Sequence, residues 1–162
     1  MTMPAYSDPQ ADLLQAFLQT EYRVLPSTNA AGVAIDVLIG RHHPRLDQFT
    51  EHRDWAIVTA FNPGGHADQP SANKQRHQQL LAAVASAGLD FLPACNHDPS
   101  DRWPDEPSLL IIAPDRDWLI ALALRLGQHA LVSARPSKAA ELWLIAGTWP
   151  EPLPAHVRMV RQ

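Results

Sequence analysis

The chain has 162 residues, enough for one domain with a sizeable core, and 46% of its residues are hydrophobic while 19% are charged. Its formal net charge of −4 at pH 7 argues against nucleic acid and anionic membranes as partners, because both are bound by clustered Lys and Arg. A single cysteine, Cys95, excludes an intrachain disulfide and a cysteine-based metal knuckle. The first ten residues lack a signal-peptide pattern and no apolar run approaches the ~20 residues of a membrane span, so we expect a cytoplasmic protein.

The first third of the chain predicts a helix followed by extended pieces. Residues 8–19 are typical of a helix, because Ser7 or Asp8 can cap it, Pro9 suits its first position and mostly leucine side chains form one apolar stripe. Residues 22–25 predict a short extended piece. Residues 33–39 alternate between apolar and other side chains, which predicts a strand with one face more deeply buried, and residues 46–51 predict one helical turn.

The stretch 55–76 organises the rest of the chain. Residues 55–61 are apolar on both faces, as in a central strand, and the sequence Asn62-Pro63-Gly64-Gly65 ends that strand. Ser71 is a candidate cap for a helix that runs to Ala87 and stops at Gly88. The remaining predicted elements are strands 89–94 and 108–113, a helix over 115–126, and strands 130–134 and 140–145.

From residue 55 the predicted order is strand, helix, strand, strand, helix, strand, the ferredoxin-like βαββαβ arrangement. We therefore predict an α+β fold: a two-layer sandwich with helices on one face, a ferredoxin-like core extended by one strand on each side, and an N-terminal helix. The extending strands are 33–39 and 140–145. Residues 1–147 form a single domain in this interpretation, and residues 148–162 form a Pro-rich tail to which we assign no structure.

This order of elements brings distant polar residues to one edge of the sheet. The end of strand 55–61, the start of the next helix, loop 95–107 and the turn after Gly127 all lie at that edge, along with Asn96 and Asp98. The positive end of a helix dipole also points there. The candidate ligand-binding residues are Asn62, Asn73, Arg76, Trp103, Glu106, Ser108 and Gln128.

With these residues in view, the chain resembles a bacterial family known only as domain of unknown function 3293, from about Tyr22 to about Leu144. The matching features, in order, are Ala60-Phe61-Asn62-Pro63, Asn73 with Arg76, Pro93, Trp103 with Glu106-Pro107-Ser108, Gly127-Gln128, and Ala130. The chain departs from the pattern at Gly65, Asn96 and His129, where Ser, Gly and Asn are usual, which argues against a strict catalytic role for loop 62–66. The resemblance implies a small cytoplasmic domain with no assigned activity.

Three functional hypotheses follow. The leading one is binding of a small anionic or nucleotide-like ligand at the polar edge, because Arg76 lies one turn into the helix. The second is a protein-interaction or structural module, with Trp118, Trp143 or Trp149 meeting a partner of unknown identity. The third is a small enzyme that uses Glu106 or Cys95.

Each candidate also has a purely structural interpretation. Asn62 could form an Asx turn, Trp103 could anchor its loop, and Arg76 could pair with Glu106 to hold the edge together. Eight histidines show no HxxxH or HExxH spacing, so we expect no metal, and no nucleotide-cofactor loop is present, so we expect no cofactor. No catalytic residue is assigned.

Overall fold

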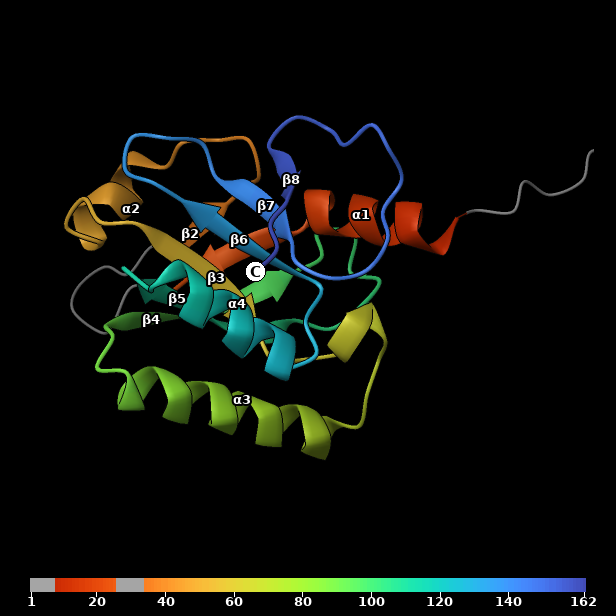
Figure 1. Ribbon diagram of the computed structural model, residues 1–162, viewed down its shortest axis with the longest axis horizontal. Coiled ribbons are helices and arrows are strands. Elements are labelled where there is room, and N and C mark those ends of the chain that lie inside the picture. Colours follow the sequence, from red (N-terminus) through yellow and green to blue (C-terminus); the bar gives the residue numbers. More distant parts are fainter. Residues whose placement is uncertain (1–7, 26–33) are drawn as a thin grey trace, which may run out of the picture.

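The computed structural model describes residues 8–25 and 34–162, and in that part of the chain four α helices accompany one eight-stranded mixed sheet (Figure 1). The α+β class is therefore confirmed. The helices are α1 (Pro9–Gln19), α2 (Pro44–Phe49), α3 (Pro70–Ser86) and α4 (Arg116–Arg125). The strands are β1 (Glu21–Val24), β2 (Ile35–Val37), β3 (Trp55–Thr59), β4 (Phe91–His97), β5 (Glu106–Ile112), β6 (Ala130–Ala134), β7 (Glu141–Leu144) and β8 (Val157–Met159).

The strand order is β2-β1-β4-β5-β3-β6-β7-β8. Every neighbouring pair is antiparallel except β7 and β8, which are parallel. Helix α3 connects β3 to β4, and α4 connects β5 to β6. We expected one extra strand on each side of β4-β5-β3-β6, but the sheet has two. Strand β1 lies between β2 and β4, and β8 follows β7.

Helices cover both faces of the sheet, so the expectation of helices on one face is wrong. Successive residues of β3 point to opposite faces. Ile57 belongs to a core cluster that includes Leu14 of α1, whereas Val58 belongs to a second cluster with Leu80 of α3 and Leu119 of α4. In Figure 1, α3 lies along the bottom of the molecule with α4 above it, whereas α1 lies at the right, level with β7 and β8. The physical reason is already present in β3: a strand that is apolar on both faces requires cover on both.

Local capping fixes two of these helices. Asp8 accepts a hydrogen bond from the Gln10 backbone N–H at 3.0 Å and caps α1, as predicted. Asp115 accepts one from the Trp118 N–H at 3.0 Å and caps α4. Helix α3 begins at Pro70 without a side-chain cap, so the predicted Ser71 cap is wrong.

The Pro-rich segment, to which we assigned no structure, completes one edge of the sheet. Strand β8 places Val157 opposite Leu142 of β7. Trp149 is only 7% exposed, its indole N–H donates to the Ala146 carbonyl at 2.8 Å, and its ring lies 6.1 Å from that of Phe17. These contacts bring the segment around Trp149 against α1.

Among the described residues, no helix combines the length and the apolar character that crossing a bilayer requires.

Candidate functional site

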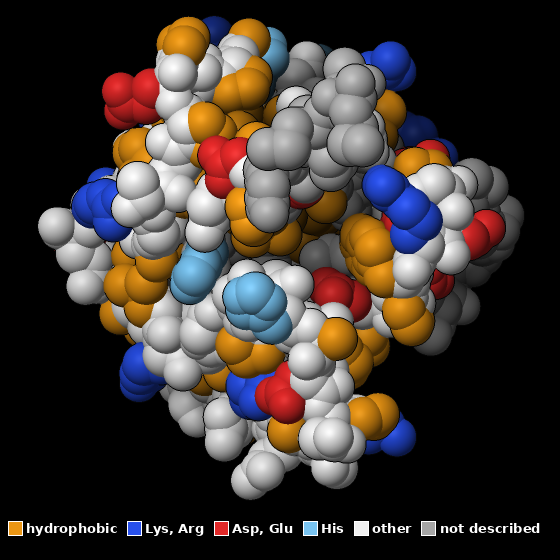
Figure 2. Space-filling view, turned by 90° about the vertical axis from the view of Figure 1, so that its right-hand side faces the viewer, with side chains coloured by type: hydrophobic (Ala, Val, Ile, Leu, Met, Phe, Trp, Pro, Cys, Tyr) orange, Lys and Arg blue, Asp and Glu red, His pale blue; other side chains and the backbone are white. Residues whose placement is uncertain are grey.

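A cavity of about 270 Å³ lies between α1 and the face of the sheet that α1 covers. Figure 2 looks onto the end of the molecule at the right of Figure 1, where hydrophobic and histidine side chains gather near the middle of the face. Leu13, Phe17, Ile57, Val132 and Leu142 contribute much of the apolar wall. This volume is just below the ~300–1,000 Å³ typical of ligand pockets, so the cavity suits a small molecule.

Three polar residues form a row across neighbouring strands on this face. Tyr22 of β1 is directly opposite Asn96 of β4, which is directly opposite Glu106 of β5. Residues paired in this way point to the same face of the sheet, with Cβ atoms about 5 Å apart. All three line the cavity, and we call them the polar row.

Each member of the polar row has a different hydrogen-bonding state. The Glu106 carboxylate accepts from Asn62 Nδ2 at 2.7 Å, and burial raises the pKa of this carboxyl although that hydrogen bond acts in the opposite direction. The Tyr22 hydroxyl donates to the Phe17 carbonyl at 2.8 Å, and burial raises its pKa. Asn96 is 9% exposed, and its buried Oδ1 has no hydrogen-bond partner among the described residues.

Asn62 and Asn73 come together as predicted and hold the end of β3. The Asn62 backbone N–H donates to Asn73 Oδ1 at 2.9 Å, and Asn73 Nδ2 donates back to Asn62 Oδ1 at 2.9 Å. Asn62 has a φ of 48°, in the left-handed region that Asn tolerates better than most residues. Its Oδ1 also accepts from the Asp68 N–H at 3.0 Å. Asn62 thus orients the Glu106 carboxylate and organises the loop after β3.

Arg76 does not pair with Glu106, so that structural alternative is wrong. Its Nε donates to the Ala60 carbonyl at 3.0 Å, and its Nη2 donates to Asp68 at 2.8 Å and to Asn73 Oδ1. The guanidinium is therefore committed to the loop, and Arg76 does not line the cavity. Asn73 is also absent from the cavity wall, so both residues support the loop after β3 without contacting the cavity.

The other predicted residues divide between the wall and the core. Trp103 and Gln128 line the cavity, and Gln128 Nε2 donates to the Phe61 carbonyl at 3.0 Å. Ser108 is 1% exposed within β5, its hydroxyl has no described partner, and it does not line the cavity. Asp98 is buried and accepts from Ser100, which makes it a loop-forming residue.

Glycines allow the loop after β3 to pack closely against its neighbours. The Gly64 N–H donates to the Gly127 carbonyl at 2.9 Å. Gly127 has a φ of 74°, and a Cβ there would lie 2.7 Å from the Pro63 Cβ. A Cβ on Gly65 would lie 2.6 Å from a Leu13 methyl of α1. The loop is therefore attached both to the turn after α4 and to α1.

Residues 58–131 match the model of a family described as "Protein of unknown function (DUF3293)". The chain resembles the DUF3293 family. This confirms the resemblance expected from the sequence, over a shorter stretch than the predicted 22–144. No curated protein and no solved structure matches the chain.

The DUF3293 segment, residues 58–131, contains all seven predicted site residues and also Asn96, but only part of the cavity. Sequence reasoning placed Asn96 near the edge without selecting it as a ligand-binding residue, because we ended its strand near Pro93. It missed the contributions of Phe17, Thr20 and Tyr22, which precede the DUF3293 segment. Nothing in their local pattern indicates where α1 docks, since a helix stripe predicts burial but not the surface it meets.

Cys95 points away from the cavity. It alternates with Asn96 along β4 and therefore projects from the opposite face. Burial, together with Asp105, raises the pKa of its thiol, which lowers its nucleophilicity at neutral pH. His97 Nδ1 lies 2.6 Å from an Asp105 oxygen. Within residues 8–25 and 34–162, no three His, Cys, Asp or Glu side chains are grouped to hold a metal ion.

Proposed function

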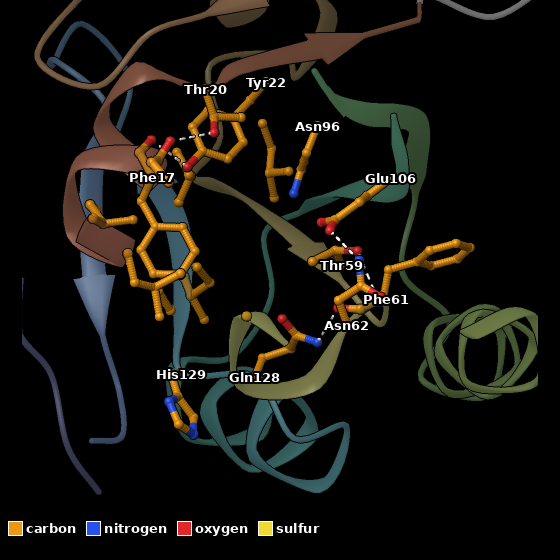
Figure 3. Close-up of a pocket in the computed structure, with 18 of the residues that line it drawn as sticks. Phe17, Thr20, Tyr22, Thr59, Phe61, Asn62, Asn96, Glu106, Gln128 and His129 are labelled. Atoms are coloured by element: carbon orange, nitrogen blue, oxygen red, sulfur yellow. Dashed lines mark hydrogen bonds between the residues drawn. The ribbon is translucent and has the colours of Figure 1, made fainter. Parts of the chain in front are cut away.

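We propose that this domain binds a small organic molecule in the cavity between α1 and the sheet. The observation that carries the proposal is a pair of polar groups in the cavity wall: the Asn96 side-chain NH₂ and the Glu106 carboxylate both point into the cavity (Figure 3). A ligand group that accepts from this NH₂ gains a hydrogen bond worth about 0.5–1.5 kcal/mol, whereas Asn96 Oδ1 is too deeply buried to face the cavity. An enclosed, largely apolar space with a few convergent polar groups is the usual form of a binding site.

The charges around the cavity favour an uncharged ligand over the anionic one that the sequence suggested. Among the described residues, the cavity lining includes no Lys or Arg, and Arg76 forms an ion pair with Asp68 in the loop. The Glu106 carboxylate would repel a carboxylate or phosphate placed beside it. We therefore retain a nucleotide-like ligand only in a form that lacks the phosphate.

We further propose that β3-α3-β4-β5-α4-β6 is a ferredoxin-like core. The spatial order β4-β5-β3-β6, with antiparallel pairing throughout, supports this. In this arrangement the loops after β3 and β4 meet beside the start of β5, which is how Asn62, Asn96 and Glu106 reach one cavity.

Filling the cavity tests the binding proposal. Ala16 lines it from α1, and Ala16→Leu adds apolar volume at a position where Leu is a good helix former. Ala82→Leu is the matched control, because Ala82 is exposed on α3. We expect compounds found by thermal-shift screening to stabilise the native chain and Ala82→Leu but not Ala16→Leu. Equal stabilisation of both variants would place the binding elsewhere.

Enzymatic use of Glu106 is a second candidate, favoured by its raised pKa inside a cavity. If a bound compound is consumed during an NMR time course, Glu106→Gln should abolish turnover while retaining affinity to within about tenfold. Loss of affinity and turnover together would assign Glu106 to binding alone.

The protein-interaction hypothesis has less support. Trp149 is buried. The Arg158 guanidinium lies over the Trp143 ring, 5.6 Å from its centroid, and the Trp143 indole N–H donates to the Glu141 carboxylate at 3.0 Å. Trp149 is therefore not an exposed contact, and Trp143 is partly covered by charged side chains.

A further inference from the structure

The cavity presents a hydrogen-bond donor and an acceptor side by side. Asn96 and Glu106 are directly opposite each other on β4 and β5. In Figure 3 the Asn96 Nδ2 and the Glu106 carboxylate both point into the same space, and Phe17 faces them across it. Since Asn62 Nδ2 occupies Glu106 Oε1, Oε2 is left to accept from a ligand. The wall thus offers one donor and one acceptor about 5 Å apart at their Cβ atoms.

Resting on the proposed function of this cavity, we infer that its ligand is an uncharged ring with an amide-type edge, an N–H next to a C=O. The ligand N–H donates to Glu106, and its carbonyl accepts from Asn96 Nδ2. Lactams, pyridones and nucleobases carry such an edge. A ring that meets both groups turns its apolar side toward Phe17, and Leu13 and Val132 add to the apolar wall.

Two other ligand classes fit less well. An ammonium group has donors but no acceptor, so it would leave Asn96 Nδ2 without a partner. A carboxylate has acceptors but no donor and would lie against the Glu106 carboxylate. The Tyr22 hydroxyl, third in the polar row, already donates to the Phe17 carbonyl and can only accept from a ligand. The row therefore presents acceptors at both ends and a donor between them.

The test titrates the ¹⁵N-labelled full chain by NMR with four probes of one ring each: 2-pyridone, N-methyl-2-pyridone, toluene and benzylamine. We expect 2-pyridone to bind and to shift the Asn96 side-chain NH₂ resonance. N-methylation removes the donor to Glu106 and should weaken binding about tenfold. Toluene should bind more weakly than 2-pyridone without moving that resonance.

Two variants test whether Glu106 and Asn96 recognise the amide-type edge of the ligand. In Glu106→Gln the new Oε1 accepts from Asn62, which turns an NH₂ donor toward the ligand N–H, so 2-pyridone should lose its advantage over N-methyl-2-pyridone. In Asn96→Leu the 2-pyridone affinity should fall about tenfold while toluene binds at least as well. Because the four probes are also compared on the native chain, a variant that fails to fold leaves the test intact.

The outcomes separate this inference from the proposed function. If none of the probes and no screened compound binds in the cavity, the proposed function is overturned. If toluene binds as well as 2-pyridone on the native chain, the cavity remains a binding site but the amide-type edge is wrong. Tighter binding of benzylamine than of 2-pyridone would likewise replace it with a basic ligand.

Discussion

The reciprocal hydrogen bonds between Asn62 and Asn73 allow a quantitative test, because Asn73→Ala removes several hydrogen bonds at a buried position. Asn73 is 4% exposed, exchanges two hydrogen bonds of 2.9 Å with Asn62, and accepts a third from Arg76. Two neutral bonds at about 1 kcal/mol each, and one to a charged group discounted for solvent, suggest a loss of about 3 kcal/mol. For a chain of this length the expected fall in Tm is about 6–12 °C.

Urea denaturation followed by circular dichroism measures this change. Lys74→Ala is the matched control, because Lys74 is the exposed neighbour in α3 and should change the free energy of unfolding by less than about 0.5 kcal/mol. Asn73→Asp keeps the acceptor for the Asn62 N–H but loses the return donor, so its stability should lie between the other two. Equal stabilities of Asn73→Ala and Lys74→Ala would refute the view that these hydrogen bonds hold Asn62 in its left-handed conformation.

Three further predictions concern single positions. Burial raises the folded-state pKa of Glu106 above the ordinary 4.5, so its contribution to stability is complete below that value and is lost as pH rises through the raised pKa. Glu106→Gln should therefore gain stability relative to the native chain between pH 4 and pH 8, and parallel pH profiles would contradict this. In urea denaturation, Gly127→Ala should lower the free energy of unfolding by about 1–3 kcal/mol more than Gly88→Ala. Both glycines have positive φ, but only a Cβ on Gly127 would clash with the Pro63 ring, and equal losses would rule out that clash as a cause. Cys95→Ser should leave ligand affinity unchanged within about twofold, because this side chain faces away from the cavity, and a larger loss would contradict that placement.

The order of elements was predictable because its signals are local. Asp8 and Asp115 lie where helix caps belong, and β3 is apolar at each successive position. The predicted topology alone placed Asn62 near Asn73 and Glu106, before any side-chain contact was known. Those approaches follow from strand direction alone.

Side-chain partners within loops were not predictable in the same way. Arg76 pairs with Asp68 rather than Glu106 because the loop before α3 folds back on Asn62, and the sequence pattern does not specify that loop conformation. The end of β4 was also misplaced. Pro93 lacks an N–H, which favours a strand end, but its carbonyl accepts from the Leu25 N–H at 2.9 Å and the strand continues to His97. Asn96 was overlooked for that reason.

The two halves of the cavity come from different parts of the chain, and this divides their roles. Asn96 and Glu106 lie in the DUF3293 segment on paired strands, where the sheet fixes their spacing. Phe17 comes from α1, which is attached to the rest of the site through Leu13 against Gly65 and through the Tyr22 hydroxyl. In the proposed binding mode the strands determine which polar edge is recognised and α1 determines the remaining space. Changes on α1 should then alter ligand size while leaving the preference for the edge intact. Substitutions on β4 or β5 should do the reverse.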